Sequence, residues 1–150
     1  MAAQGLVSWI VCLAHYGAMS DPRSGEYPDF RRARHPTRVY RGWSDEDGCH
    51  VEVFDSAFPE ESGNPRMLFP DVSRKVKDCC DRLGWGDESA ASEQLSVALL
   101  LDVTGDPVMA RHWHKSFTAK YVSRLRADWS VPELDIALWL YCFENARPGA

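Results

Sequence analysis

One apolar segment, residues 90–103, limits the folds open to this chain more than any other feature. Its apolar residues would lie on nearly every side of a helix, whereas a surface helix is apolar along a single stripe. These residues are Leu95, Val97, Ala98, Leu99, Leu100, Leu101 and Val103. Asp87 or Ser89 is placed to cap this helix. Such a helix must be covered from several directions, so we expect it to form the centre of the core.

Two more helices are expected towards the C-terminus. Gly105 occupies the position in which glycine commonly ends a helix, and Asp106 can cap a second helix that reaches about Leu125. Ser130 and Glu133 have the spacing of a capping box, which predicts that a third helix begins at Ser130. The C-terminal half is therefore expected to be helical throughout.

A β-hairpin is predicted ahead of the helices. Apolar and polar residues alternate over residues 49–53, the period of a strand with one buried face. Residues 47–48, Asp-Gly, suit a tight turn, and residues 39–43 provide the partner strand. Residues 58–70 are expected to form a loop. Apolar residues that recur at intervals of three and four predict a short amphipathic helix over residues 73–83.

The predicted fold class is α+β, with a β-hairpin or small antiparallel sheet packed on a C-terminal bundle of three to four helices. We expect a single globular domain over residues 38–143, because 150 residues suit one domain. Residues 1–37 are interpreted as an N-terminal apolar segment followed by a linker rich in arginine and proline. Residues 144–150 are interpreted as a frayed tail.

The cysteines and the longest apolar run predict the compartment. Five cysteines, an odd number, show no disulfide-framework spacing, and no secretory signal is recognisable before them. We therefore expect free thiols and a cytoplasmic protein, in the host cytoplasm if a phage encodes it. The longest apolar run, residues 5–14, is about half as long as a bilayer requires, so no membrane span is expected.

The net charge of −5 is unevenly distributed. Residues 39–104 contain six basic and fourteen acidic residues, a net charge of −8. Such a region repels phosphate backbones, which argues against direct nucleic-acid binding. It could form a surface for a basic partner, or serve only to keep the protein in solution. The acidic residues predicted to bind a partner are Asp45, Glu46, Asp47, Glu52, Asp55, Glu60, Glu61, Asp87 and Glu88.

Three motifs together resemble a known family. They are Tyr40-Arg41-Gly42 at the hairpin entry, Trp85-Gly86 followed by the run from Gln94 to Asp106, and Phe117, Leu125, Trp129-Ser130 and Leu140 in the helical half. This combination resembles an uncharacterised domain-of-unknown-function family of small bacterial, archaeal and phage proteins, over residues 38–141. The resemblance implies a fold, and no activity is carried over with it.

The sequence departs from that family at its most distinctive motif. The family's centre usually reads W-G-Y-G-G-S-G-P-x-Q-L-A-L-A-L-L followed by G-D. Here residues 87–92 read D-E-S-A-A-S where the family has Y-G-G-S-G-P. Any role of those glycines is therefore not carried over to this chain. Relatives in phage and plasmid genomes imply a role in conflict between mobile elements and their hosts.

The residues that could bind metal or act as nucleophiles show no recognisable spacing. His112 and His114 lie two apart on a predicted helix, so their side chains point about 200° apart and cannot share one metal ion. Cys79 and Cys80 lack C-x-x-C spacing. We therefore expect no metal, no cofactor and no catalytic residues, with the histidines on a polar helix face and the cysteines in the core. A cysteine–histidine pair brought together only by folding stays open.

By elimination, the sequence favours a non-enzymatic protein-binding module. The expected partner is a basic protein surface. If a phage or mobile element encodes the chain, that surface is the nucleic-acid channel of a host defence complex of CRISPR type, with carboxylates standing where phosphates would. A small structural or housekeeping domain is one alternative. The other is a DNA-binding transcriptional regulator that uses the basic residues Arg111, Lys115, Lys120, Arg124 and Arg126.

Overall fold

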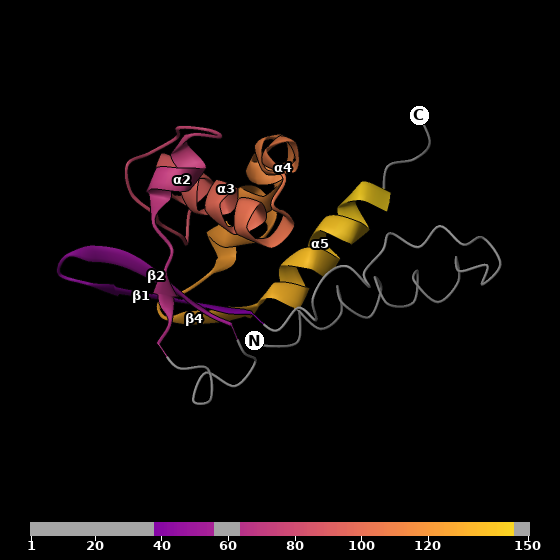
Figure 1. Cartoon of the computed structure of the whole chain (residues 1–150). Coiled ribbons are helices and arrows are strands. Elements are labelled where there is room, and N and C mark those ends of the chain that lie inside the picture. Colours follow the sequence, from indigo (N-terminus) through magenta and orange to yellow (C-terminus); the bar gives the residue numbers. More distant parts are fainter. Residues whose placement is uncertain (1–37, 56–63, 146–150) are drawn as a thin grey trace. The chain divides into compact units, whose positions relative to one another are not determined.

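The computed structural model describes residues 38–55 and 64–145, and this part of the chain contains four strands and four helices (Figure 1). The strands are β1 (Val39–Asp45), β2 (Gly48–Phe54), β3 (Arg66–Met67) and β4 (Trp129–Pro132). The helices are α2 (Pro70–Arg74), α3 (Ala90–Thr104), α4 (Pro107–Lys120) and α5 (Glu133–Asn145), with a 3₁₀ helix η1 (Val122–Arg124) after α4. The predicted α+β class is confirmed.

Two terminal segments, residues 1–37 and 146–150, lie outside the described part of the chain. The expectations of an apolar N-terminal segment, an arginine- and proline-rich linker and a frayed tail therefore fall largely on residues that are not described. Residues 38–55 and 64–141 belong to one compact unit. Among the described helices, none is both long and apolar enough to span a membrane.

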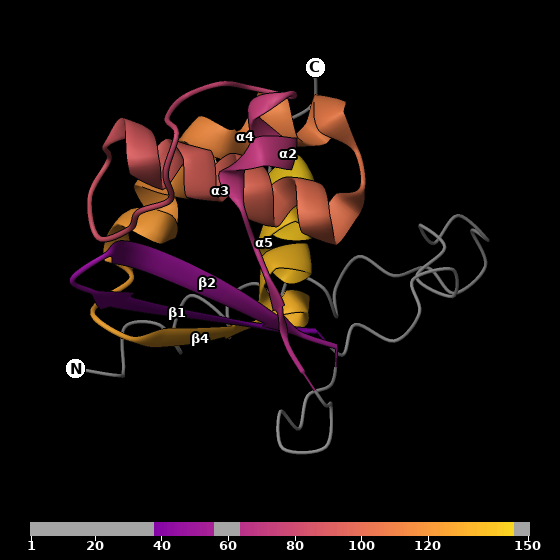
Figure 2. The same ribbon diagram turned by 60° about the vertical axis from the view of Figure 1, so that its left-hand side comes forward.

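The strands form one antiparallel sheet in the order β3-β2-β1-β4. The predicted hairpin is confirmed as β1 and β2, with Tyr40 opposite Val53 and Gly42 opposite Val51. β1 also pairs with β4, where Gly42 lies opposite Trp129. These five residues are buried on one face of the sheet, because side chains alternate between the faces of a strand. In Figures 1 and 2 the helices α2, α3 and α4 lie on one side of this sheet.

The central helix predicted from the sequence is α3, and its burial is confirmed. Ser89 caps it by accepting a hydrogen bond from the Ser92 backbone N–H at 3.4 Å, and Gly105 ends it in the left-handed conformation (φ 66°). The polar residues along its buried stretch need partners inside the protein. Ser96, for example, shares a 2.6 Å hydrogen bond with Thr118 of α4. The side chains exposed by 3% or less include Leu95, Val97, Ala98, Leu99 and Leu100.

A network of ion pairs ties the start of β1 to the ends of two helices. The Arg38 guanidinium donates to both carboxylate oxygens of Glu133, at 3.1 and 2.9 Å, and to Asp102 Oδ2 at 3.2 Å. Asp102 also accepts from the Tyr40 hydroxyl at 2.6 Å and from Arg66 at 2.7 Å. Burial, reinforced by the Asp102 charge, raises the pKa of Tyr40, so the phenol stays protonated and donates. This network fixes where α5 begins.

The helix predicted over residues 73–83 is wrong, because α2 ends at Arg74 and turns follow it. The cause is a contact from another element. Gln94 of α3 accepts hydrogen bonds through Oε1 from the backbone N–H groups of Cys79 (2.8 Å) and Cys80 (3.0 Å). Backbone donors that bond to this side chain are not bonded within a helix. The buried Gln94 therefore determines the path of the segment.

The capping box predicted at Ser130 is also wrong, since Ser130 lies in β4 and α5 begins at Glu133. The Glu133 carboxylate does not return to the Ser130 backbone but pairs with Arg38. The Glu133 backbone N–H donates to the Arg38 carbonyl at 2.8 Å. Residues 129–132 are extended because they complete the sheet along the free edge of β1.

Two smaller predictions need correction. The second C-terminal helix, α4, ends at Lys120 rather than near Leu125, because Tyr121 leaves helical geometry (φ −123°, ψ −65°) and η1 follows. The loop predicted over residues 58–70 contains the short strand β3 in its described part, where it pairs with β2.

Leu99→Ala is expected to lower the free energy of unfolding by about 2–5 kcal/mol, because the fully buried side chain would leave a cavity in the core. Denaturant unfolding followed by tryptophan fluorescence measures the change. Val108→Ala is the control: Val108 is 72% exposed on α4, so its truncation should change stability by less than about 0.5 kcal/mol. Equal losses in the two variants would contradict the assignment of α3 as the core.

Gly42→Ala is expected to lower the free energy of unfolding by about 1–3 kcal/mol, because a Cβ at this position would overlap the Trp129 indole. Ser44→Ala, at an exposed position of the same strand, should have little effect. The same unfolding measurement compares the two variants. A Gly42→Ala protein as stable as the wild type would show that the indole can move aside without cost.

Candidate functional site

A pocket of about 380 Å³ lies where β1 pairs with β4. Arg41 is directly opposite Glu52 of β2 and Ser130 of β4, so these three side chains share the face of the sheet that points away from the buried residues. The lining contains two carboxylates and one guanidinium, which makes it acidic at neutral pH. The lining residues are Arg41, Gly42, Trp43, Glu52, Asp128, Trp129 and Ser130.

Trp129 lies against β1 because the facing residue has no side chain. A Cβ on Gly42 would overlap the indole, so glycine is required for this close approach. The ring of Trp85 packs edge-on against Trp129, with 5.5 Å between the ring centroids, and its Nε1 donates to the Ala127 carbonyl at 3.1 Å. Within the described residues, the buried Nε1 of Trp129 has no hydrogen-bond partner. Close packing therefore holds this ring in place.

A row of outward-facing side chains joins the pocket to the hairpin turn. Trp43 is half-buried and stacks on His50 across the strand pair, with 5.3 Å between the ring centroids. His50 Nε2 lies 2.8 Å from Asp45 Oδ1, and this hydrogen bond lowers the pKa of Asp45. Asp45 also accepts from the Asp47 backbone N–H at 2.9 Å. The carboxylate at the turn is therefore charged and held in place at neutral pH.

The loop before α3 brings one of the predicted acidic residues, Asp87, near the start of β2. Burial raises the pKa of the Cys49 thiol, which is also sensitive to the positive charge of Arg82 and the negative charge of Asp87. The loop before α3 is therefore near the start of β2. We name the exposed acidic residues of the turn and this loop the acidic turn cluster. It consists of Asp45, Glu46, Asp47, Asp87 and Glu88.

The other predicted acidic residues are placed differently. Glu52 is half-buried and lines the pocket. Asp55 follows the opposite end of β2 from the turn, about 23 Å away along a seven-residue strand. Glu60 and Glu61 lie outside the described residues. The acidic residues expected to form one surface over residues 45–61 are therefore divided between the turn, the pocket and the far end of β2.

Of the seven residues that line the pocket, only Glu52 was among the predicted partner-binding residues. Trp43 and Arg41 had a usable signal, because alternation along the predicted strand puts both on its outward face. Asp128 had none, since the residues that follow it were expected to begin a helix rather than a strand.

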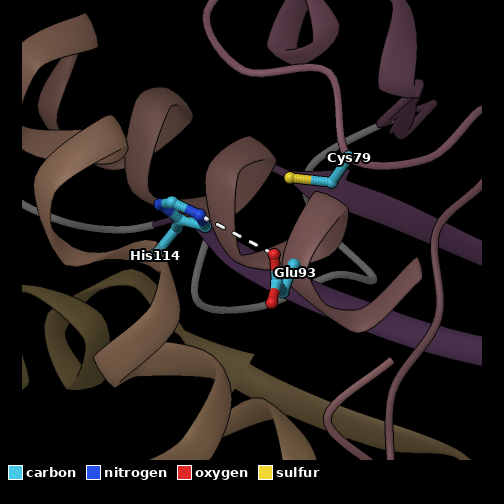
Figure 3. A group of neighbouring side chains, drawn as sticks. All are labelled: Cys79, Glu93 and His114. Carbon is cyan, nitrogen blue, oxygen red and sulfur yellow. Dashed lines mark ion pairs between the residues drawn. The ribbon is translucent and has the colours of Figure 1, made fainter. Parts of the chain in front are cut away.

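His114 does not lie on a polar helix face, as was predicted. Its ring is 5% exposed, whereas His112 is exposed on another side of α4. Figure 3 shows the His114 ring pointing towards Glu93 of α3 and Cys79, and candidate ligand atoms of the three lie within 4.8 Å of one another. Burial raises the pKa of the Cys79 thiol, and the Glu93 carboxylate raises it further. With no cation bound, this thiol is protonated at neutral pH.

The described cysteines agree in part with the sequence. Cys49, Cys79 and Cys80 carry free thiols, as predicted, and Cys12 lies outside the described residues. The prediction of core positions is wrong for Cys49, which is exposed on β2, and Cys79 and Cys80 are only partly buried.

Comparison with known proteins agrees with the resemblance noted in the sequence. The model of one family, described as a family of unknown function (DUF6166), matches residues 40–141. No curated protein and no solved structure matches the chain. The matched range includes all of the hairpin except Val39, together with the pocket and the whole of α3 and α4. The chain therefore belongs to the family of unknown function DUF6166.

Proposed function

We propose that this domain is a non-enzymatic protein-binding module that takes a basic segment of a partner protein. The segment places one cationic side chain in the pocket between β1 and β4 and runs along the acidic turn cluster. The observation that carries the proposal is the acidic, tryptophan-lined pocket of about 380 Å³, joined to that cluster by the row Trp43, His50 and Asp45.

A lysine or arginine side chain suits the chemistry of the pocket. Glu52 and Asp128 supply carboxylates, and Trp43 offers an aromatic ring for a cation–π contact. The cation already in the lining, Arg41, lies with its guanidinium carbon 5.6 Å from the centre of the Phe54 ring, a contact within the domain. Ligand pockets commonly enclose about 300–1,000 Å³, so this volume suits one side chain better than a large ligand.

The acidic turn cluster would act mainly on the rate of association. All of its side chains are exposed, and the turn that carries three of them also carries the hydrogen bond between His50 and Asp45. Exposed ion pairs add little affinity individually, but a patch of one sign steers an oppositely charged partner and falls in strength as salt rises. The acidic turn cluster therefore raises the rate of association, and the pocket holds the bound segment in place.

The regulator alternative requires basic residues that are free to contact phosphates. Arg111 instead donates through Nε and Nη2 to the Val76 carbonyl, at 3.3 and 2.9 Å. Arg126 Nη1 donates to the carbonyls of Ser123 at 3.1 Å and Gly86 at 3.4 Å. Two of the five proposed phosphate contacts are therefore engaged within the domain, which counts against DNA binding.

The arrangement around His114 counts against thiol catalysis. In a cysteine–histidine–acid site, the acid orients the histidine through the ring nitrogen that does not face the nucleophile. Here a backbone group orients the ring instead, because His114 Nδ1 lies 2.8 Å from the Arg111 carbonyl oxygen. The acid, Glu93, lies on the Nε2 side of the ring. A nucleophilic thiol also needs a lowered pKa, whereas burial raises that of Cys79.

In its most specific form, the proposal makes the partner a host defence complex of CRISPR type, and the chain a product of a phage or mobile element. The support is chemical. Carboxylates of the acidic turn cluster would occupy positions that phosphates hold in a channel lined with lysine and arginine. Binding of the domain and of nucleic acid to such a complex would then be mutually exclusive.

Charge reversal in the acidic turn cluster is expected to slow partner association by about tenfold or more at low salt. The variant Glu46→Lys/Glu88→Lys changes two exposed residues and spares Asp87, which accepts hydrogen bonds from the Ser89 N–H and Ser92 hydroxyl. A partner captured from host lysate supplies the binding assay, and surface-based kinetics at two salt concentrations measure the association rate.

Asp71→Lys/Asp81→Lys is the matched control, because it makes the same change in net charge at exposed positions outside the cluster and the pocket. It should retain most of the wild-type association rate. Equal rates for the wild type and Glu46→Lys/Glu88→Lys would mean that the cluster only keeps the protein in solution. Retention of promoter DNA in place of a protein would favour the regulator alternative.

Trp43→Ala is expected to speed dissociation of the same partner by about fivefold to thirtyfold, the effect of losing roughly 1–2 kcal/mol of cation–π and packing contact. The association rate should change little, since no charge is altered. The dissociation phase of the kinetic assay measures this. Unchanged dissociation would show that the pocket is not the anchoring site.

A further inference from the structure

We propose that Cys79, Glu93 and His114 form a zinc-binding site with an open fourth coordination position. The three residues come from the segment after α2, the first turn of α3 and the middle of α4 (Figure 3). Their ligand atoms lie within 4.8 Å of one another. Thiolate, imidazole and carboxylate are the donors that zinc takes in proteins. The inference goes beyond the proposed binding function and does not depend on it.

His114 provides the observation that points to a ligand. Its Nδ1 lies 2.8 Å from the Arg111 carbonyl oxygen, which can only accept, so the proton of the neutral ring is on Nδ1. The lone pair is then on Nε2. That atom is buried and has no hydrogen-bond partner in the described part of the chain, although the ring is only 5% exposed. A buried acceptor without a partner is unusual in a folded protein and needs an explanation.

The surroundings of Nε2 supply that explanation. Glu93 Oε2 lies 3.8 Å away, too far for a hydrogen bond, and Cys79 lies on the same side of the ring. Zinc bonds of about 2.0–2.3 Å in a tetrahedral site put neighbouring ligand atoms about 3.3–3.8 Å apart. The observed spacing therefore leaves room for an ion at the common centre, with only small side-chain movements needed to close around it.

The hydrogen bond to the Arg111 carbonyl is also what a zinc ligand requires. Metal-binding histidines commonly donate their second ring N–H to a backbone carbonyl or carboxylate, which fixes the orientation of the ring. In a catalytic thiol site, by contrast, the acid would occupy this position. The acid and the sulfur instead converge with Nε2, as the ligands of one ion do.

Neighbouring contacts hold the Cys79 segment in position for this site. The Gln94 side chain accepts from the Cys79 and Cys80 backbone N–H groups and donates to the Ser73 hydroxyl at 2.8 Å. Arg111 binds the Val76 carbonyl from α4. The segment that carries the sulfur is thus tied to both helices that carry the other ligands. The site is preorganised by the fold, and the sequence expectation of no metal is replaced by this proposal.

The ligand set favours zinc and similar transition ions over calcium and magnesium. Calcium and magnesium take oxygen ligands only, whereas a thiolate and an imidazole favour zinc and similar transition ions. Cys80, the next residue, does not supply a fourth ligand, because its Sγ is directed to Asp81, 3.6 Å from Oδ1. The fourth coordination position is therefore left to water or an incoming ligand.

The test uses the tag-free full chain, reduced and freed of metal by dialysis against a chelator. Calorimetric titration with Zn²⁺ and native mass spectrometry should find one ion per chain, and zinc should raise the thermal midpoint. Titration with Co²⁺ should give a thiolate-to-cobalt charge-transfer band together with the intense visible bands of a tetrahedral site. Cys79→Ser should abolish the charge-transfer band. His114→Asn and Glu93→Gln should weaken zinc binding by more than the roughly 10–100-fold that is typical of losing a residue that only orients a ligand.

Two variants serve as controls because each changes a ligand-type residue next to the site. Cys80→Ser and His112→Asn should still bind one zinc ion with a wild-type cobalt spectrum. Far-UV circular dichroism shows whether each variant is folded, and Glu93→Gln keeps the side-chain shape should the other two fail to fold. The proposal is overturned if the wild type binds no zinc, if Glu93→Gln binds it as tightly as the wild type, or if Cys80→Ser alone loses the charge-transfer band.

Discussion

The burial of α3 is the constraint on which the rest of the structure depends, because it forces the polar side chains of this helix to find partners inside the protein. Gln94 is fully buried and bonds the Cys79 and Cys80 backbone and the Ser73 hydroxyl. A buried polar group left without a partner costs about 1–3 kcal/mol, so the segment after α2 follows the path that satisfies Gln94. That path is what places Cys79 beside Glu93 and His114.

The features that the sequence predicted correctly are those specified by neighbouring residues. The α3 helix has its apolar run, its Ser89 cap and the left-handed Gly105 within one short stretch, and the β1–β2 hairpin has its alternation and turn within another. The pocket was partly accessible in the same way, since strand alternation places Trp43 outward. The family match over residues 40–141 adds that these elements form one recurring unit.

The features that could not be predicted depend on residues far apart in the chain. Local residues around Ser130 favour a capping box, but Glu133 pairs with Arg38, 95 positions away, and β4 completes the edge of β1. A capping box contributes on the order of 1 kcal/mol, which a part-buried bidentate ion pair and a strand pairing can outweigh. The cluster of Cys79, Glu93 and His114 was hidden for the same reason, because its ligands share no sequence spacing.

Two buried side-chain atoms in the described residues lack a hydrogen-bond partner, Trp129 Nε1 and His114 Nε2, and their surroundings separate a packing effect from a binding site. The Trp129 N–H is a donor pressed against Gly42, where the missing side chain lets the indole approach the strand. The free-energy cost of leaving this N–H without a hydrogen bond is offset by the packing of the large aromatic ring. The His114 nitrogen is an acceptor that faces an acid and a thiol rather than a backbone. Glu93 Oε2 is at ion-pair distance, 3.8 Å, and makes no hydrogen bond to it, whereas a shared cation would bind all three groups at once. For this reason a missing hydrogen-bond partner indicates close packing at Trp129 and a ligand site at His114.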